Sequence, residues 1–516
     1  MITNCPNCTS ARINKKGRDV RHGTISQRYK CKMCHTNFYD TSSTEVKIAE
    51  IKIAEEIVST TFAQTWVITS AVSDTPVNKV ALDALINYCR YNDAELLIVP
   101  LKYKLHGLAE ADSEYTWAEE VQPYLINKNI RLTCNLTLLA GVRVSPAIAN
   151  PLIGFDSFSK GDSLIIGHPQ IAMKTIAVSH VDSSAMMATT GCVTEPIYTQ
   201  TKQGSRAIFN HSLSAVVIEK DGNDFHYRVL HTDEDVIYDL DKRYADGSVA
   251  LVNSIPALII GDEHIIHVDE SVTEATFTDM YSMVNVLRPE FICRHDSLDF
   301  YSGSHHHKHN VFTNYAKHHS ETDNIENELK LTIDYIIRTT PEFSKSVIIG
   351  SNHNGHLLRW LNECNPKTDP RNSALYHELM YLMLSETKMG DAGSIHPDPL
   401  ELWTKHNYAN IDNIRFLSSS ESFIIKGIEL ALHGHQGANG SRGNVAGFSK
   451  LAKKTITGHS HSPAIFEGAY SVGHSCKSKL EYNSGPSSWA HCHVLIYENG
   501  KRTPIFIKNG RWRANR

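Results

Sequence analysis

The sequence predicts an α/β protein with a small cysteine-rich module at its N-terminal end. Three observations carry this prediction. Two Cys-x-x-Cys pairs lie within the first 34 residues, a strand–helix–strand pattern begins near Thr65, and five apolar runs after residue 250 each lead into a cluster of Asp, His or Asn. With 516 residues, the chain is long enough for two or three domains.

The composition is that of an ordinary globular protein, with 41% hydrophobic and 21% charged residues. A net charge of −5 excludes a globally basic nucleic-acid coat, so any contact with DNA must come from local patches. No apolar run approaches the ~18–20 residues that cross a bilayer, and the first residues lack the pattern of a signal peptide. The odd number of 11 cysteines fits reduced thiols. We therefore expect a cytoplasmic protein without a membrane partner.

Residues 1–42 contain both Cys-x-x-Cys pairs, and we expect them to form a zinc ribbon. Two such pairs can close a tetrahedral thiolate site, and the doubling of the motif argues against a redox pair. The four zinc ligands would be Cys5, Cys8, Cys31 and Cys34. The module also carries the basic residues Arg12, Lys15, Lys16, Arg18, Arg21, Arg28, Lys30 and Lys32. Such a charge pattern suits contact with a phosphate backbone, and a protein-docking knuckle with a solvated face is the alternative.

Two further segments precede the histidine-rich half of the chain. Residues 43–64 are expected to link the ribbon to the next domain through a helix from about Thr44 to Thr60. Residues 65–248 begin with a strand–helix–strand pattern, which predicts an α/β domain. No Gly-rich phosphate loop accompanies this pattern, and the domain contains no motif that indicates an activity.

Residues 249–516 hold 21 of the 29 histidines, which points to metal chemistry in this part of the chain. The apolar run Leu258–Gly261 predicts a buried strand, and Asp262 and His264 follow it. If the strand geometry persists, these side chains point the same way, and a carboxylate with an imidazole can bind one divalent ion. The other four clusters are His295-Asp296-Ser297-Leu298-Asp299, Ser351-Asn352-His353-Asn354, Leu432-His433-Gly434-His435 and Gly458-His459-Ser460-His461.

The five clusters resemble the signature of the calcineurin-like metallophosphoesterases, whose blocks run DxH, GDxxD, GNH(D/E), H and GHxH. The match covers residues 250 to 470, and the order, spacing and strand context of the blocks agree. The resemblance implies a four-layer α/β sandwich over residues 249–516. In block layout, the chain further resembles the double-strand-break repair exonucleases and the host-DNA-degrading nucleases of T-five-like phages.

The resemblance also implies a centre of two metal ions that share a bridging carboxylate. The first ion would be held by Asp262, His264 and His461. The second would be held by Asn352, His433 and His459, with Asp296 as the bridge. His353 would stabilise the transition state or protonate the leaving oxygen. The mixed Asp, His and Asn ligands favour manganese, iron or zinc over magnesium, and we expect manganese.

Two blocks depart from the family pattern. His295 stands where the family has Gly, and Asn354 replaces the carboxylate that holds the catalytic His. An amide can orient an imidazole but cannot stabilise its protonated form, which leaves the exact role of His353 open. In the fourth block the first His is the expected ligand, and His435 would contact the substrate or orient a ligand. Asp299 would orient its neighbours.

Two loops indicate the substrate. His307 belongs to the histidine-rich stretch 304–309, for which a flexible polar loop is the alternative. Arg442 belongs to a Gly-rich loop, and Lys450, Lys453 and Lys454 follow it. Glycines let backbone N–H groups approach phosphates, and the cations supply counter-charge. Together with the ribbon, these residues suit a long polyanion better than a small phosphomonoester.

We therefore expect a metal-dependent DNase that hydrolyses DNA phosphodiester bonds by a two-metal mechanism. Its partner would be DNA, it would form a homo-oligomer, and it would be phage-encoded and degrade host DNA in the host bacterial cytoplasm. Two alternatives stay open. One is a metallophosphatase or phosphodiesterase that acts on nucleotides or phosphoproteins, and the other is a non-catalytic zinc-ribbon protein that binds DNA.

Overall fold

The structure is a computed structural model that describes residues 4–21, 24–39, 58–59, 63–103, 115–179, 184–391, 393–418, 421–481 and 483–514. The chain divides into two compact units, Met1–Ile57 and Val58–Arg516. The described residues form a mixed α/β fold with several sheets, as the sequence predicts.

The first unit contains a three-stranded antiparallel sheet of β1 (Ile13–Arg21), β2 (Thr24–Cys31) and β3 (Asn37–Tyr39). Its small core contains Tyr29 and Phe38 together with Cys5 and Cys31. Most of the linking helix predicted for residues 44–60 lies outside the described residues. At Val58–Ser59 that prediction is wrong, because these two residues form the short strand β4.

A six-stranded sheet organises the C-terminal half of the second unit. Its described strands run in the order β22 (Ile414–Leu417), β19 (Lys345–Ile349), β18 (Phe291–Arg294), β17 (Ala257–Ile259), β28 (Cys492–Ile496) and β29 (Arg502–Phe506). The first four strands are parallel, and the last two form an antiparallel hairpin beside them. Side chains alternate along β17, so Ala257 and Ile259 face one core while Leu258 faces another.

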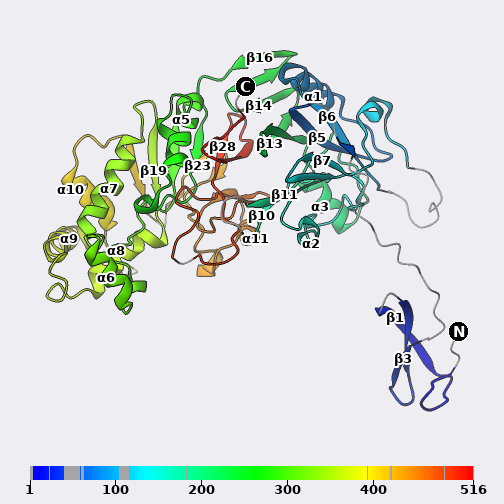
Figure 1. The fold of residues 1–516 in the computed structure, drawn as a ribbon, viewed down its shortest axis with the longest axis horizontal. Helices are drawn as coiled ribbons and strands as arrows, with labels where there is room; N and C mark the ends of the chain where they lie inside the picture. The colour runs from blue at the N-terminus through cyan, green and yellow to red at the C-terminus, as the bar shows by residue number, and fades with distance from the viewer. Residues whose placement is uncertain are drawn as a thin grey trace. The chain divides into compact units, whose positions relative to one another are not determined.

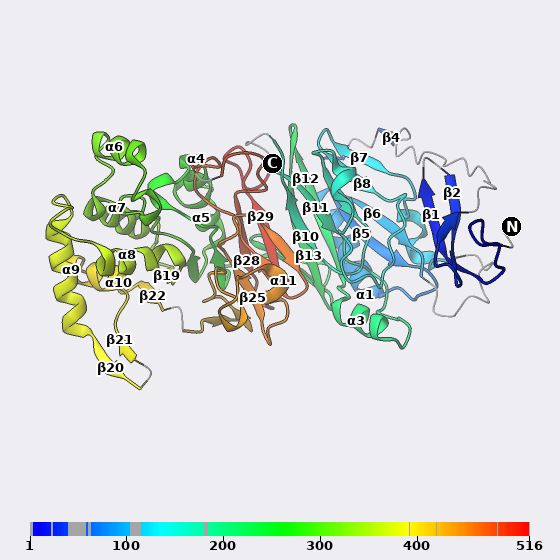
Figure 2. The ribbon, with the colours of Figure 1, turned by 90° about the horizontal axis from the view of Figure 1, so that it is seen from below.

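Helices cover one face of this sheet, and Figure 2 shows α7, α8 and α10 beside β19 and β22. These helices are α7 (Ile325–Arg338), α8 (Asn352–Glu363), α9 (Ser373–Glu386) and α10 (Pro399–Asn407). Leu329 of α7, Leu357 of α8 and Trp403 of α10 are buried in the same core as Leu258. Each apolar face thus fixes its helix against the sheet.

The opposite face of the six-stranded sheet shares a core with a larger sheet. Among the described residues this sheet has eleven strands. Their order is β23 (Ile424–Ile425), β24 (Ile428–Glu429), β25 (Lys454–Thr457), β27 (Ala469–Ser471), β26 (Ala464–Phe466), β10 (Met173–Ile176), β11 (Ala185–Thr189), β9 (Ser163–Ile166), β8 (Leu136–Leu139), β7 (Ile130–Thr133) and β4. Met173 of β10 pairs with Ile465 of β26, so the segments 65–248 and 249–516 share one sheet.

A third sheet contains the predicted strand–helix–strand unit. Its described order is β16 (Ser248–Leu251), β15 (Lys242–Ala245), β14 (Val236–Asp239), β13 (Asp224–Asp233), β12 (Ser214–Asp221), β5 (Thr65–Val72) and β6 (Glu95–Leu101). Strands β5 and β6 are parallel and α1 (Lys79–Asn92) connects them, which confirms the βαβ prediction (Figure 1). The helix begins where the Asn78 side chain accepts a hydrogen bond from the Ala81 N–H.

The remaining described elements are short or peripheral. They include α2 (Asp156–Ser159), α3 (Lys202–Asn210), α4 (Glu270–Thr273), α5 (Met283–Leu287), α6 (Val311–His319), α11 (Val445–Phe448), the 3₁₀ turn His305–His307, and the hairpin of β20 (Lys388–Gly390) and β21 (Gly393–Ile395). Within the described residues, every helix is too short or too polar to cross a membrane.

Candidate metal centre

The predicted metal ligands follow strands of two facing sheets. Asp262, Asp296 and Asn352 come after β17, β18 and β19, whose parallel course brings their carboxyl ends to one edge of the six-stranded sheet. His433 and His459 come after β24 and β25, which are parallel neighbours in the eleven-stranded sheet. Polar side chains far apart in the chain therefore meet at one place.

The expectation that strand geometry continues through Asp262 and His264 is wrong. Strand β17 ends at Ile259, and Asp262 forms only an isolated bridge with His474. The backbone of His264 has a left-handed φ of 43°. Both side chains nevertheless reach one cluster, because the chain turns sharply after the strand.

The first part of the centre consists of Asp262, His264, Asp296 and His461, which are all buried and whose ligand atoms lie within 4.8 Å of one another. His461 Nε2 is 3.0 Å from Asp262 Oδ2 and 3.1 Å from His264 Nε2. Atoms that bind one ion at about 2.1 Å and at right angles lie about 3.0 Å apart. The cluster therefore has the spacing of ligands that share a metal ion.

The second part of the centre is built around His433, whose Nε2 lies 3.1 Å from Asp296 Oδ2. The ring centroids of His459 and His435 are 5.4 Å and 5.5 Å from that of His433. Asn352 is the first residue of α8, and its Oδ1 is buried without a hydrogen-bond partner in the described structure. Asp296 contacts both parts of the centre, as a bridging carboxylate requires.

The donor atoms and the backbone both fit bound metal ions. The Oδ1 atoms of Asp262 and Asp296 are buried, and they accept no hydrogen bond from any described residue. Such buried polar atoms are costly unless another group satisfies them. His264, Asp296, His459 and His461 have φ values of 43°, 45°, 70° and 54°. Non-glycine residues rarely adopt this region, and such strain concentrates at functional sites.

The buried carboxylates and imidazoles of the centre shift one another's pKa values. Burial raises the pKa of Asp296, but the imidazoles of His433 and His353 more than offset this, and the pKa lies well below its usual range. Burial lowers the pKa of His264, but Asp299 and Asp296 outweigh burial and raise it to about 9. Burial lowers the pKa of His461. The centre thus concentrates negative charge, which divalent cations would neutralise.

A buried ion pair holds the strands under the centre. Glu263 lies between the two ligands of the first block, and its Oε1 is 2.6 Å from Arg294 Nη1, with both side chains fully buried. Glu263 Oε2 also accepts a hydrogen bond from Ser297 Oγ, while Arg294 donates to Ser346 Oγ and to Thr339. This network joins the segment after β17 to the end of β18 and to the start of β19, so it positions Asp262 and Asp296, which follow the first two strands.

His353 is held by Asp299 and not by Asn354. The Nδ1–H group of His353 donates a hydrogen bond of 2.7 Å to the backbone carbonyl of Asp299. Ser351 caps α8 by accepting a hydrogen bond from the Asn354 N–H group, and its hydroxyl donates to Asn354 Oδ1. The Asp299 carboxylate lies 2.7 Å from His264 Nδ1, which leaves His264 Nε2 free for a metal ion. The expected orienting role of Asp299 agrees with these contacts.

Two further histidines belong to the centre. His295 is buried, and its Nδ1 lies 3.4 Å from His433 Nδ1. Sequence reasoning noted His295 only as a departure from the family pattern. His474 is also buried, with its ring centroid 5.7 Å from that of His461 and its Nε2 without a partner in the described residues. It follows β27 and an apolar stretch, which is the signal that identified the other ligands.

A cleft of about 710 Å³ opens beside the centre, and Asn352 and His353 line it together with Asp299. His307 lines the same cleft, as expected, and its Nε2 lies 3.5 Å from Glu481. His435 is half-buried beside His433. The cleft gives a substrate access to the predicted ligands and to His353.

The basic residues after the Gly-rich loop lie elsewhere. Lys454 is the first residue of β25, whereas the metal ligands follow the last residue of that strand. Lys453 and Lys454 line a separate cleft of about 490 Å³ together with Lys501. They do not line the cleft beside the metal centre, and their expected contact with a long polyanion stays a prediction. Arg442 is exposed, and its backbone pairs with Gln436.

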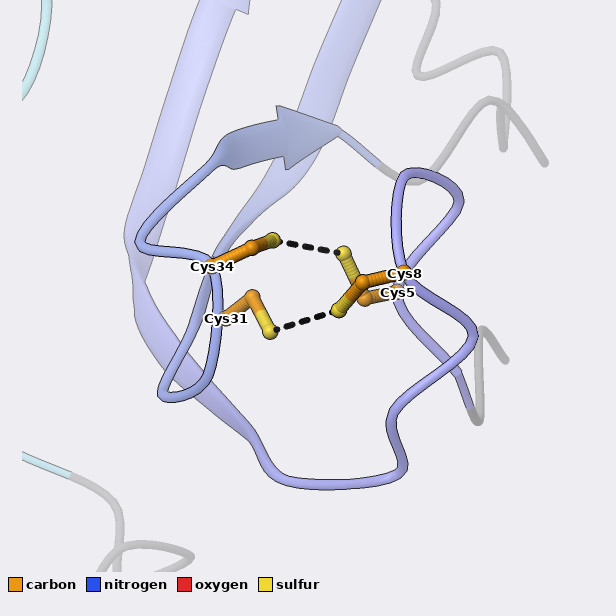
Figure 3. A group of neighbouring side chains, drawn as sticks. All are labelled: Cys5, Cys8, Cys31 and Cys34. Carbon is orange, nitrogen blue, oxygen red and sulfur yellow. Dashed lines mark hydrogen bonds between the residues drawn. The ribbon is translucent and has the colours of Figure 1, made fainter.

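The four N-terminal cysteines form a separate cluster in the first unit, and Figure 3 shows their sulfur atoms pointing toward one another. The Sγ atoms of Cys5 and Cys34 are 3.6 Å apart, and those of Cys8 and Cys31 are 3.5 Å apart. Four sulfurs bound to one zinc ion at about 2.3 Å lie about 3.8 Å apart. The free thiols therefore fit a structural zinc site.

Comparison with known proteins identifies one relative. Protein A1 of Escherichia phage T5 is 31% identical over 466 residues, which cover 87% of this chain and 83% of that protein. No protein-family model matches the chain, and no solved structure matches it.

Proposed function

The chain belongs to the family of Protein A1 of Escherichia phage T5, and we propose that it is a phage-encoded, metal-dependent nuclease that hydrolyses DNA phosphodiester bonds. The name of that relative states no activity, so the proposal rests on the chemistry of the site. One observation carries it: the buried Asp296 Oδ2 lies 3.8 Å from His264 Nε2 and 3.1 Å from His433 Nε2, and these two imidazoles follow strands of two facing sheets. This arrangement supports membership of the metallophosphoesterase superfamily.

The proposal assigns the ligands as two sets that share Asp296. Asp262, His264 and His461 would hold one ion, and His433, His459 and Asn352 would hold the other. Bound divalent ions supply Lewis acidity to a phosphate group and an activated water at neutral pH. Because each set mixes oxygen and imidazole ligands, manganese is the proposed metal.

His353 is the proposed acid for the leaving oxygen. Its Nδ1–H group is occupied by the Asp299 carbonyl, so its Nε2 is the nitrogen that can exchange a proton with a substrate. Its side chain is 20% exposed and lines the cleft, which makes this nitrogen accessible to a substrate. The Asp299 carbonyl fixes the tautomer and the orientation of the ring, and a carboxylate orients this ring in the family pattern.

DNA is the proposed substrate because a basic module accompanies the centre in one chain. Arg12, Lys15, Lys16 and Arg28 of the first unit are exposed. Exposed cations on a small ribbon suit contacts with a phosphate backbone, which depend strongly on salt. We further propose that the protein forms a homo-oligomer and acts in the cytoplasm of the host bacterium.

The test is cleavage of linear and closed-circular duplex DNA in the presence of manganese. Wild type should cut DNA, Asp296→Ala should abolish cutting, and His353→Ala should slow it by about 10²–10⁴-fold. His406→Ala is the matched control, because His406 is an exposed histidine on α10 and should retain wild-type activity. A manganese-loaded protein that leaves DNA intact but hydrolyses a small phosphoester would instead indicate a metallophosphatase.

A further inference from the structure

Three histidines outside the proposed two-metal centre form a second cluster. His305 and His306 lie on the 3₁₀ turn His305–His307, and His356 lies on α8. Their ring nitrogens all approach within 4.8 Å of one another. The ring centroids of His305 are 3.9 Å from those of His306 and 4.7 Å from those of His356.

Local structure holds this cluster in place. His356 follows Asn352 by four residues on α8, so both side chains project from the same face of that helix. The loop after β18 that carries the other two histidines is anchored by Glu328, whose carboxylate accepts hydrogen bonds of 2.9 Å and 2.7 Å from the backbone N–H groups of Tyr301 and Ser302. The three imidazoles are thus presented from two fixed elements.

The chemical state of the rings suits metal binding. Burial and the neighbouring imidazole of His353 lower the pKa of His356 to about 3, and burial lowers the pKa of His305. Neutral imidazoles are the form that binds metal ions. The Nδ1 atom of His305 is buried, and no described residue gives it a hydrogen-bond partner.

We propose that His305, His306 and His356 bind a third divalent metal ion, a borderline transition metal such as zinc or cobalt. The set contains three imidazoles and no carboxylate, which distinguishes it from the Asp and His ligands of the two-metal centre. Imidazole binds zinc and cobalt well, whereas magnesium and manganese prefer oxygen ligands. The third site should therefore select against the ions that suit the other centre.

The position of the site suggests what the ion contacts. A row of imidazoles connects the two-metal centre to the third site. The ring centroid of His353 lies 4.7 Å from that of His264 and 4.9 Å from that of His356. His306 and His356 line the same cleft as His353. An ion with three protein ligands keeps a position open. On the basis of the proposed function, that position binds an oxygen of the DNA phosphate next to the phosphodiester that is cleaved.

The test counts bound ions in the full-length protein. Metal-free wild type, His356→Ala and His406→Ala are saturated with manganese and then titrated with zinc, and the zinc retained per chain is measured by elemental analysis. His356→Ala should retain one zinc equivalent fewer than wild type, while His406→Ala should match wild type. Equal zinc content in all three proteins would overturn the proposal.

Two further measurements keep this result independent of folding and of the nuclease proposal. His306→Ala changes an exposed side chain on the turn and should lose the same zinc equivalent if His356→Ala disturbs α8. In a cobalt titration, subtracting the spectrum of either variant from that of wild type should leave a visible absorption band, and a flat difference spectrum would contradict the site. Neither measurement uses DNA, so an inactive protein would refute the nuclease proposal and leave the zinc count unaffected.

Discussion

The substitution Gly458→Ala tests whether Asp262 is a metal ligand without changing any proposed ligand. A Cβ atom on residue 458 would lie 2.2 Å from Asp262 Oδ1 and 3.0 Å from a ring carbon of His295. The backbone of residue 458 is fixed, because its N–H group donates a hydrogen bond of 2.7 Å to the His433 carbonyl. The Asp262 carboxylate must therefore move.

The displacement of the Asp262 carboxylate can be compared with the deviation in metal–ligand distance that a metal site tolerates. Relief of the clash to an ordinary contact of about 3.4 Å needs a shift of about 1.2 Å, whereas metal–ligand distances tolerate about 0.2 Å. A 1 Å misplacement at a reaction centre can cost about 10²-fold in rate. We expect Gly458→Ala to lose one manganese ion per chain, as measured by elemental analysis, and to cut duplex DNA about 10²-fold more slowly.

Gly355→Ala is the matched control for this prediction. Gly355 is an exposed residue inside α8, and an added Cβ would meet no atom within 4 Å. Alanine should stabilise the helix by about 0.5–1 kcal/mol and leave the metal content unchanged. If Gly458→Ala retains the metal content and cleavage rate of Gly355→Ala, the assignment of Asp262 as a ligand is refuted.

Three other predictions follow from the same contacts. Asp299→Asn removes the charge beside His264 Nδ1 and should weaken manganese binding about 10–100-fold in a calorimetric titration, and unchanged affinity would contradict the orienting role of this carboxylate. Arg294→Met leaves Glu263 buried without its ion partner and should lower the free energy of unfolding by about 3–5 kcal/mol in urea, and a loss near zero would show that the pair is not needed. Burial raises the pKa of Glu328 from 4.5 to about 7, so folding favours the protonated carboxyl and this contribution to stability is lost as pH rises through 7. The free energy of unfolding of Glu328→Gln should therefore rise by up to about 3 kcal/mol relative to that of wild type as pH increases from 4.5 to 7. Unfolding free energies of the two proteins that change in parallel with pH would contradict the shift.

Much of the candidate centre could be predicted from the sequence because one physical rule produces it. An apolar run that forms a buried strand ends where the chain leaves the core, and parallel strands end at the same edge of a sheet. Asp262, Asp296 and Asn352 could therefore be grouped before any contact was known. The strand–helix–strand prediction at β5, α1 and β6 is correct because the local pattern of apolar residues is enough to identify these elements.

Features that depend on distant parts of the chain could not be predicted in this way. The pairing of Met173 with Ile465 joins two segments nearly 300 residues apart, and no local pattern in either strand encodes it. The left-handed backbone of His264 is another example, because the glycine of this stretch, Gly261, lies three residues earlier and does not mark His264. The position of Lys454 is a related case, since a strand has two ends and its sequence does not show which end faces the centre.

The position of Asp299 explains how the chain departs from the family pattern and still orients His353. Ser351 caps α8, and the Asn354 side chain accepts a hydrogen bond from Ser351 instead of holding the imidazole. Asp299 takes over that role with its backbone carbonyl, while its carboxylate orients His264, which is a proposed metal ligand. One residue thus fixes both the first metal site and the proposed acid. A shift of the loop at Asp299 should therefore impair metal affinity and leaving-group protonation together, whereas in the family pattern separate blocks carry these two functions.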